Sequence, residues 1–268
     1  MKKVAVQLSG LSRGFEITSK IFEYWNNIFD DIEFTFFLTT WNNQDVWEDK
    51  VKNKGGQDKL NLDNYKFLHS YELLDPDDID WNDFTSMGKG NAPYYTYALY
   101  KCNELRKKSE IEFDACITTR IDIFLDINLL KNIKNHLYSG SNSMISPISF
   151  ATTTGTGVLK DVQGKYRFLI PNDNFGIGHP KSMDKFCKMH EDCFVTNKNI
   201  RKSLHFIQAQ QLMNYDIYNI SIGGSALLIR NGHLQKLGWP TSRILKILIE
   251  EKGVEFLYSR PDIRKFFT

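Results

Sequence analysis

Four polar clusters could carry chemistry in this chain, because each follows a run of apolar residues that would form a strand. They are Ser9-Gly10 with Arg13, Thr39 to Asn42, Arg120 with Asp122, and Asn172-Asp173-Asn174. In open α/β sheets, ligands bind beyond the carboxyl ends of the strands, at the point where the strand order reverses. We therefore expect these clusters, which lie far apart in the sequence, to line one binding crevice.

The first cluster suits a nucleoside diphosphate. The segment Ser9 to Gly14, SGLSRG, combines small residues, backbone amides ahead of a helix and the guanidinium of Arg13. Helix N-termini bind phosphate, and arginine binds it through two parallel hydrogen bonds. The segment matches neither the G-x-x-x-x-G-K-[ST] loop nor the G-x-G-x-x-G fingerprint, so a tight turn with a surface arginine is the alternative.

Arg120 and Asp122 form the most specific of the four clusters. They follow the apolar run from Cys116 to Thr119, where a charged pair is expensive to bury unless it is paired or contacts a ligand. A carboxylate at this place can bind a Mg²⁺ or Mn²⁺ ion that bridges two phosphates, with Asp122 as the metal ligand. A structural ion pair is the alternative.

Three further features have competing interpretations. Trp41 is the one candidate aromatic residue at a predicted strand end, and we expect it to stack on a nucleobase or sugar ring. The spacing of Cys187, His190 and Cys193 permits zinc, but a buried helix face explains it better. The aspartate-rich residues 74–91 could bind calcium, but they lack the spaced ligands of an EF-hand and favour a solvated loop.

The pattern of apolar residues predicts the elements that position these clusters. Strands are expected at 3–8, 32–38, 65–68, 113–119 and 166–170, with a short strand pair at 217–222 and 226–229. Helices are expected at 15–29, 92–108, 181–194, 200–214 and 241–258. Strands alternate with helices in the first half, which is typical of a parallel sheet covered by helices. The predicted fold is therefore a doubly wound α/β domain.

Composition and charge exclude several classes of protein. Of 268 residues, 41% are apolar, which is too many for a disordered chain. The net charge of +2 excludes a surface that is basic all round, although residues 181–268 hold 14 Lys and Arg against 8 Asp and Glu. No apolar run reaches the roughly 18 residues of a membrane span, and the first apolar run ends too soon for a secretory signal. We expect a cytoplasmic protein without a transmembrane segment.

The motifs together resemble a known group of enzymes. The set S-G-x-x-R, T-T-W-N, T-R-x-D-x-x-x-D and D-N-F-x-x-G is similar to that of small nucleotide-sugar glycosyltransferases with the GT-A fold, found in bacterial surface-glycan loci and in viruses. The resemblance spans about residues 3–230. It implies a single Rossmann-like domain over 1–268, with a nucleotide-sugar-binding half at 1–126 and an acceptor-binding half with a helical C-terminal part at 127–268. It also implies a mostly parallel sheet flanked by helices.

The resemblance assigns roles to individual residues. Ser9, Gly10, Arg13, Thr40 and Trp41 would contact the nucleotide-diphosphate sugar, with Arg120 and Asp122 at the diphosphate. The family motif D-x-D holds a Mg²⁺ or Mn²⁺ ion, but Arg120 replaces its first acid here. Asp122 is then the only matched metal ligand, and Arg120 could neutralise the phosphates directly. Asp173, before the F-x-x-G turn, would act as a general base or position the donor sugar, and an Asx turn is its structural alternative.

The predicted reaction is the transfer of one sugar from a nucleotide-diphosphate sugar to an acceptor hydroxyl. A glycan or a lipid-linked oligosaccharide is the expected acceptor, by analogy alone. Three alternatives stay open: the same chemistry on a modified base of phage DNA, a nucleotidyltransferase, and a non-catalytic module that binds nucleotides or glycans.

Overall fold

The apolar runs of the first 125 residues form the parallel part of a seven-stranded sheet. This computed structural model describes residues 1–12, 14–42, 60–76, 92–139, 146, 149–152, 157–160, 167–170, 175–192, 204–215, 217–222, 226–229 and 241–267. Four strands run parallel to their neighbours in the order β3-β2-β1-β4: β1 (Lys2–Gly10), β2 (Ile32–Trp41), β3 (Leu68–Leu74) and β4 (Ala115–Arg120). Their succession confirms the prediction of an α/β fold with a mostly parallel sheet.

Strands from the second half of the chain extend the same sheet. β9 (Phe175–Gly178) lies between β4 and β6 (Ser149–Thr152) and runs antiparallel to both. β10 (Tyr218–Ser221) then pairs with β6 in parallel, so the full order is β10-β6-β9-β4-β1-β2-β3. The two halves that the sequence suggests are therefore joined through one continuous sheet.

Two small strand pairs lie outside the central sheet. β5 (Ile123–Leu125) pairs with β11 (Ala226–Leu228), and β7 (Gly157–Lys160) pairs with β8 (Arg167–Ile170), both antiparallel. The strand predicted at 166–170 is thus β8, which forms a pair with β7 and does not join the central sheet. Periodicity locates such a strand but does not reveal its partner, because pairing depends on residues distant in the sequence.

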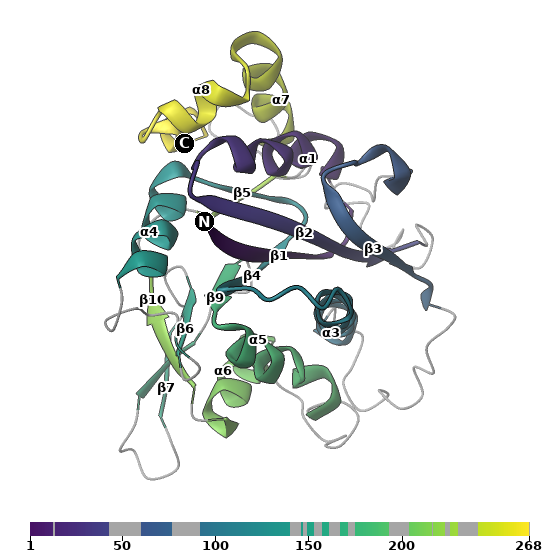
Figure 1. Cartoon of the computed structure of the whole chain (residues 1–268), viewed down its shortest axis with the longest axis vertical. Coiled ribbons are helices and arrows are strands. Elements are labelled where there is room, and N and C mark those ends of the chain that lie inside the picture. Colours follow the sequence, from purple (N-terminus) through teal and green to yellow (C-terminus); the bar gives the residue numbers. More distant parts are fainter. Residues whose placement is uncertain are drawn as a thin grey trace.

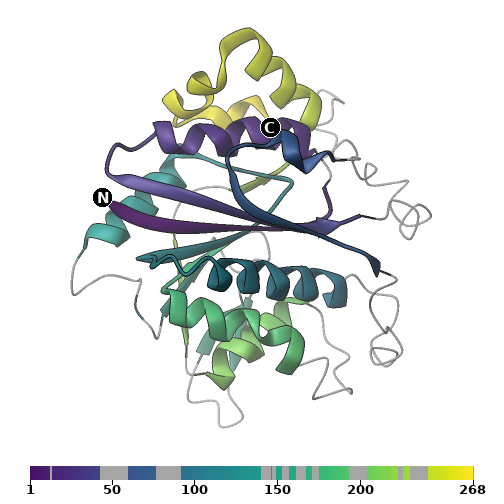
Figure 2. The same cartoon turned by 45° about the vertical axis from the view of Figure 1, so that its right-hand side comes forward.

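Two layers of helices cover the faces of the sheet. α1 (Phe15–Tyr24), α7 (Thr241–Lys252) and α8 (Val254–Ser259) lie over one face, and α3 (Ala92–Lys108), α5 (Pro180–Cys187) and α6 (Leu204–Asn214) lie over the other (Figures 1 and 2). α4 (Ile127–Tyr138) packs on the core that α1 covers, and short 3-10 helices are found at Trp25–Asn27, Leu62–Asn64 and Ile263–Phe266. The longest helix in the described ranges has 17 residues, and none there is long and apolar enough to cross a bilayer.

The alternation of side chains along each strand sorts the core into two layers. On β1, Val4, Val6 and Leu8 join the apolar cluster beneath α1 and α4. Ala5 of β1 and Phe37 of β2 join the cluster beneath α3 and α5. Because both faces of the sheet are covered, its central strands read as continuous apolar runs instead of alternating apolar and polar residues.

Three predicted boundaries were wrong. The helix predicted at 15–29 changes to a 3-10 turn at Trp25, whose indole donates to the hydroxyl of Tyr258 at 2.7 Å. The helix predicted at 241–258 breaks at Gly253, which has a φ of 82° that favours glycine. The strand predicted at 65–68 begins only at Leu68, because a 3-10 turn at Leu62–Asn64 precedes it.

A buried histidine joins α3 to the helical turn that follows α5. His190, in the helical turn after α5, is 3% exposed, and its Nδ1 lies 3.1 Å from Thr96 Oγ1 of α3. Burial lowers the pKa of His190 to about 4. Cys187 is also fully buried, as the helix-face interpretation expects, and Cys193 lies outside the described residues.

His190 should therefore make stability depend on pH. Between about pH 6.5 and 4 the unfolded chain binds a proton at His190 that the folded protein does not, so stability falls as the pH falls. The loss over this range is on the order of 3 kcal/mol. We expect His190→Gln to flatten the decrease, as measured by urea unfolding at pH 7 and pH 5. His136 and His179, whose pKa values burial also lowers, would retain a weaker dependence. An unchanged slope in the variant would contradict this expectation.

Candidate functional site

The predicted clusters meet at the carboxyl end of β1, where the strand order reverses. The chain adds β2 and then β3 on one side of β1, and it returns to add β4 on the other side. Such a point is where open α/β sheets bind ligands. Ser9 lies opposite both Thr39 and Arg120, and Gly10 lies opposite Thr40. Three of the four clusters therefore share one edge of the sheet.

The loop after β1 is shaped by two glycines. Gly10 has a φ of 119°, and its carbonyl accepts a hydrogen bond from Thr40 Oγ1 at 2.7 Å. Gly14 has a φ of 70° and immediately precedes α1. A Cβ on Gly14 would lie 2.9 Å from the carbonyl oxygen of Ile229, whereas one on Gly10 would meet nothing within 4 Å. Arg13, the predicted diphosphate contact in this loop, lies outside the described residues.

The two glycines provide a matched test of the loop. Gly10→Ala introduces backbone strain alone, and we expect it to lower the free energy of unfolding by about 1–3 kcal/mol. Gly14→Ala adds the contact with the Ile229 carbonyl, so we expect a larger loss than in Gly10→Ala. Urea unfolding of both variants measures the difference. Equal free energies of unfolding would show that the Ile229 carbonyl can move away from the new Cβ without loss of stability.

Arg120 and Asp122 form a two-pronged ion pair at the end of β4. Arg120 Nε donates to Asp122 Oδ1 at 2.8 Å, and Arg120 Nη2 donates to Asp122 Oδ2 at 3.1 Å. The side chain of Asp122 is 1% exposed and that of Arg120 is 16% exposed. The pairing satisfies both charges in a nearly water-free place, as a buried pair requires.

Three neighbouring elements hold the backbone of this turn. Ile121 N donates to the carbonyl of Ser9 in β1 at 3.3 Å, and the Ile121 carbonyl accepts from Thr18 Oγ1 of α1 at 2.8 Å. The Asp122 carbonyl accepts from Ile229 N, next to β11, at 2.8 Å. The guanidinium and the carboxylate are thus fixed relative to β1, α1 and β11 before any ligand arrives.

The second acid of the motif T-R-x-D-x-x-x-D has a structural role. Asp126 precedes α4, and its Oδ1 accepts a hydrogen bond from Leu129 N at 2.8 Å. This is the ordinary N-cap arrangement, in which a side-chain oxygen satisfies an amide of the first helical turn. Asp126 and Asp122 lie four residues apart in the sequence but serve different purposes.

Trp41 lies within the core at the end of β2. It is 2% exposed and packs with its ring centroid 5.3 Å from that of Tyr94 and 6.1 Å from that of Tyr97, both on α3. The same small cluster contains Leu74 of β3. Trp41 thus packs against α3 in the described structure, and its predicted stacking on a ligand ring stays a prediction.

A polar band beneath α3 is a feature that motif analysis missed. Gln7 Oε1, Ser9 Oγ and Thr118 Oγ1 are buried and have no hydrogen-bond partner among the described residues. Gln7 lies opposite Thr118 in the sheet, and Ser9 lies opposite Arg120. Alternation along the strands could have revealed this band, because polar residues interrupt otherwise apolar positions at one face. Buried oxygens without partners are uncommon in proteins, and each needs an explanation, such as a catalytic role or a bound water.

The strand that follows the fourth cluster in the sequence begins beside the same edge. Asn172, Asp173 and Asn174 themselves lie outside the described residues. β9 begins at Phe175, whose Cα partner in β4 is Thr119, the residue before Arg120. In the sequence, Asp173 precedes Phe175 by two residues.

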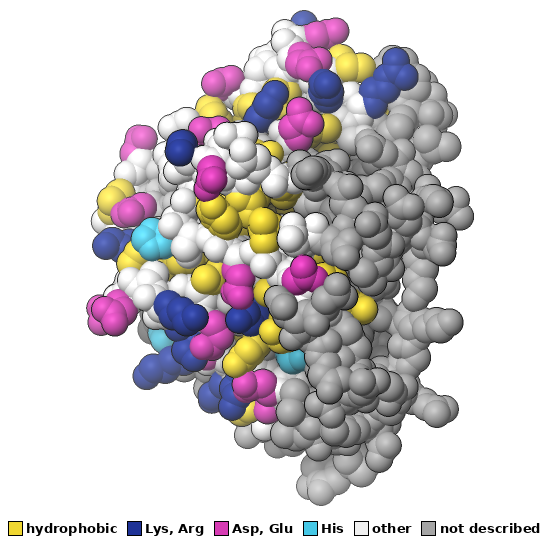
Figure 3. Space-filling view, turned by 90° about the vertical axis from the view of Figure 1, so that its right-hand side faces the viewer, with side chains coloured by type: hydrophobic (Ala, Val, Ile, Leu, Met, Phe, Trp, Pro, Cys, Tyr) yellow, Lys and Arg dark blue, Asp and Glu magenta, His cyan; other side chains and the backbone are white. Residues whose placement is uncertain are grey.

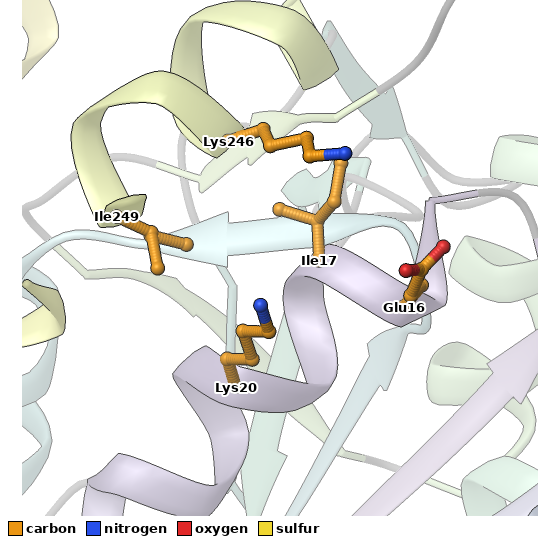
Figure 4. Close-up of a pocket in the computed structure, with 5 residues that line it drawn as sticks. All are labelled: Glu16, Ile17, Lys20, Lys246 and Ile249. Carbon is orange, nitrogen blue, oxygen red and sulfur yellow. The ribbon is translucent and has the colours of Figure 1, made fainter. Parts of the chain in front are cut away.

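Away from this edge, a small pocket lies between α1 and α7. It is lined by Glu16, Ile17 and Lys20 from α1 and by Lys246 and Ile249 from α7 (Figure 4). None of the motif residues lines it. Side chains of both charge signs are interspersed among the described residues on the face drawn in Figure 3, so no single-sign patch stands out there.

The described residues do not form a metal centre. Within the described ranges, no three His, Cys, Asp or Glu side chains gather closely enough to hold an ion. Asp122 is the only predicted ligand, and the guanidinium of Arg120 already engages both of its oxygens. The described donor set therefore does not fit a divalent cation.

Comparison with known proteins adds no family assignment. No protein-family profile matches the chain, and no curated protein sequence is similar to it at a significant level.

Proposed function

We propose that this protein is a glycosyltransferase with a GT-A-like fold, which moves one sugar from a nucleotide-diphosphate sugar to an acceptor hydroxyl. The observation that carries the proposal is the meeting of Ser9, Gly10, Thr40 and the Arg120–Asp122 pair at the strand-order reversal. The motif resemblance to nucleotide-sugar glycosyltransferases rests on the same residues. An edge of this kind is where an α/β sheet binds nucleotides.

The donor would bind across the carboxyl ends of β1 and β4. The loop from Gly10 to Gly14 leads into α1, and the positive end of the dipole of this helix favours a negatively charged group. Arg13 and Arg120 would contact the diphosphate, and Thr40 supports the loop through the Gly10 carbonyl. Trp41 would contribute to the nucleoside end of the crevice.

The chemistry is a substitution at the anomeric carbon of the donor sugar. The bond from that carbon to the diphosphate oxygen breaks, and its electron pair leaves with the diphosphate. The acceptor oxygen forms the new bond, and its proton passes to a base, for which Asp173 is the candidate. Arg120 would offset the negative charge that grows on the leaving group.

The resemblance to the family also implies Mg²⁺ or Mn²⁺ at Asp122. Such an ion would neutralise the diphosphate in the same way as a cationic side chain. Because the described donor set does not fit an ion, the proposed mechanism uses Arg120 and no metal to offset the charge on the diphosphate.

A panel of nucleotide sugars tests the function. We expect slow release of a nucleoside diphosphate from at least one donor when water replaces the acceptor. Release of pyrophosphate would instead indicate a nucleotidyltransferase, and binding without turnover would indicate a non-catalytic module. Either result would contradict the proposal.

The acceptor is proposed to be a glycan or a lipid-linked oligosaccharide. A modified base in phage DNA is the second candidate, because residues 181–268 carry an excess of Lys and Arg. Activity on DNA would fall steeply between 50 mM and 200 mM salt, since phosphate contacts release counterions. Activity on a neutral glycan would change little over that range.

A further inference from the structure

We infer that Arg120 takes the place of a divalent cation in this site, so that the enzyme activates its diphosphate leaving group without a metal. The inference rests on the proposed function and specifies how the donor is recognised. Asp122 is then a positioning residue that holds the guanidinium, and it is not a metal ligand.

The contact between Arg120 and Asp122 occupies both carboxylate oxygens of Asp122. The contact is two-pronged, with Nε and Nη2 of Arg120 on the two oxygens of Asp122 at 2.8 and 3.1 Å. A metal on Asp122 would have to compete with these bonds for the same oxygens. Displacement would also leave a guanidinium that is only 16% exposed next to a dication. Like charges at short range in a poorly solvated place repel strongly, so guanidinium and metal exclude each other.

Hydrogen bonds from neighbouring elements hold the turn that contains Arg120 and Asp122. Hydrogen bonds from Ile121 N to Ser9 and from Ile229 N to the Asp122 carbonyl fix the backbone on both sides of the pair. Thr18 Oγ1 adds a third bond, to the Ile121 carbonyl. A positive charge held in this way needs no reorganisation when charge develops on the leaving group. Mg²⁺ usually supplies the same stabilisation while held by one or two carboxylates and the substrate phosphates.

Arginine suits this role better than lysine does. Its planar guanidinium presents five N–H donors in a fixed fork, and it binds phosphate oxygens as well as carboxylates. Lysine carries the same charge as a compact point without the fork. Only arginine can therefore hold Asp122 along one edge and a diphosphate oxygen through the same charged group.

The experiment compares turnover and binding in EDTA and in Mn²⁺ or Mg²⁺. In EDTA, we expect the wild-type protein to release nucleoside diphosphate from its nucleotide sugar within about twofold of the rate with metal. Arg120→Met should lose between 100- and 1000-fold of that activity, as removal of a preorganised charge does. Arg120→Lys keeps the charge but lacks the fork of donors, so it should lose less activity than Arg120→Met and remain below the wild type. In calorimetry, both variants should bind the nucleoside diphosphate more weakly and bind the nucleoside alone as the wild type does.

Arg260→Met is the matched control. Arg260 and Asp262 have the same R-x-D spacing and the same two-pronged contact, at 2.9 and 3.0 Å, but they lie on the surface near the C-terminal helices. This variant should keep wild-type turnover. Circular dichroism of all variants shows which of them remain folded. If Arg120→Met does not fold, Arg120→Lys, which keeps the charge, is tested in its place.

Three outcomes contradict the inference. Turnover that EDTA abolishes and Mn²⁺ restores would overturn it while leaving the proposed glycosyltransferase activity in place. Wild-type turnover in folded Arg120→Met would also overturn it. If the protein shows neither turnover nor binding of the nucleoside diphosphate in any condition, the proposed function is wrong, and this inference is wrong with it.

Discussion

Replacement of Asp122 by alanine is expected to lower nucleotide-sugar turnover by about 100-fold. Asp122 is 1% exposed and gives both carboxylate oxygens to Arg120, so its loss frees the guanidinium from its fixed orientation. Misplacement of a charge-stabilising group by about 1 Å is enough for a loss of this size. Steady-state kinetics should show the loss in kcat more than in KM, because the fixed charge acts on the leaving group as its charge grows.

Asp126→Ala is the control for this variant, because it removes an acid four residues away in the same motif. Its loss should lower stability by about 1 kcal/mol through the missing helix cap and leave turnover unchanged. Asp122→Asn keeps an oxygen that can accept from Arg120 and should retain part of the activity. Wild-type turnover in folded Asp122→Ala would remove Asp122 from the site.

Replacement of Asp173 by asparagine is expected to reduce sugar transfer by two to four orders of magnitude. A positioned general base contributes about 10²- to 10⁴-fold, and asparagine cannot take the proton of the acceptor hydroxyl. The motif D-N-F-x-x-G and the start of β9 beside the end of β4 support this expectation. The measurement is the rate of sugar transfer to the acceptor as a function of pH, for the wild-type protein and for the variant.

The pH profile separates the two roles proposed for Asp173. If it is the base, the acidic limb of the wild-type profile disappears in Asp173→Asn. If it only positions the donor sugar, the limb remains and KM for the donor rises. Asn174→Ala is the neighbouring control and should retain most of the activity. Full activity of Asp173→Asn would exclude both roles.

The sequence predicted the part of the fold that depends on local pattern. Strands at 3–8, 32–38 and 113–119 correspond to β1, β2 and β4, and the helix predicted at 92–108 is α3 with the same bounds. Continuous apolar runs that end in polar residues mark the central strands of such a sheet. The meeting of Ser9 and Arg120 followed from the general rule for parallel strands.

The second half of the sheet could not be predicted in this way. β9 inserts antiparallel between β4 and β6, although β6 precedes it in the chain. Nothing in the apolar period of a four-residue strand distinguishes this order from a simple parallel succession. Pairing between distant strands depends on packing of the whole core, which local patterns do not encode.

Side-chain orientation at the site was only partly foreseen. Residues 37, 39 and 41 of β2 share a face by alternation, and Phe37 lies beneath α3. This position in the strand could have predicted the burial of Trp41 against α3, whereas the sequence analysis predicted only a ligand contact. Asp126 also carried a usable signal, since an aspartate directly before an apolar helical pattern is typical of an N-cap. The sequence leaves a structural ion pair within R-x-D open as an alternative, and this pair is present as a two-pronged contact.

A crystal structure of the protein with the nucleoside diphosphate product of its preferred donor would show where the donor binds. We expect density for the nucleotide at the carboxyl ends of β1 and β4, with its phosphates on the guanidinium of Arg120 and the Arg120–Asp122 contact intact. A nucleotide bound elsewhere, for instance at Lys20 and Lys246 between α1 and α7, with an empty edge beside Gly10, would contradict this expectation.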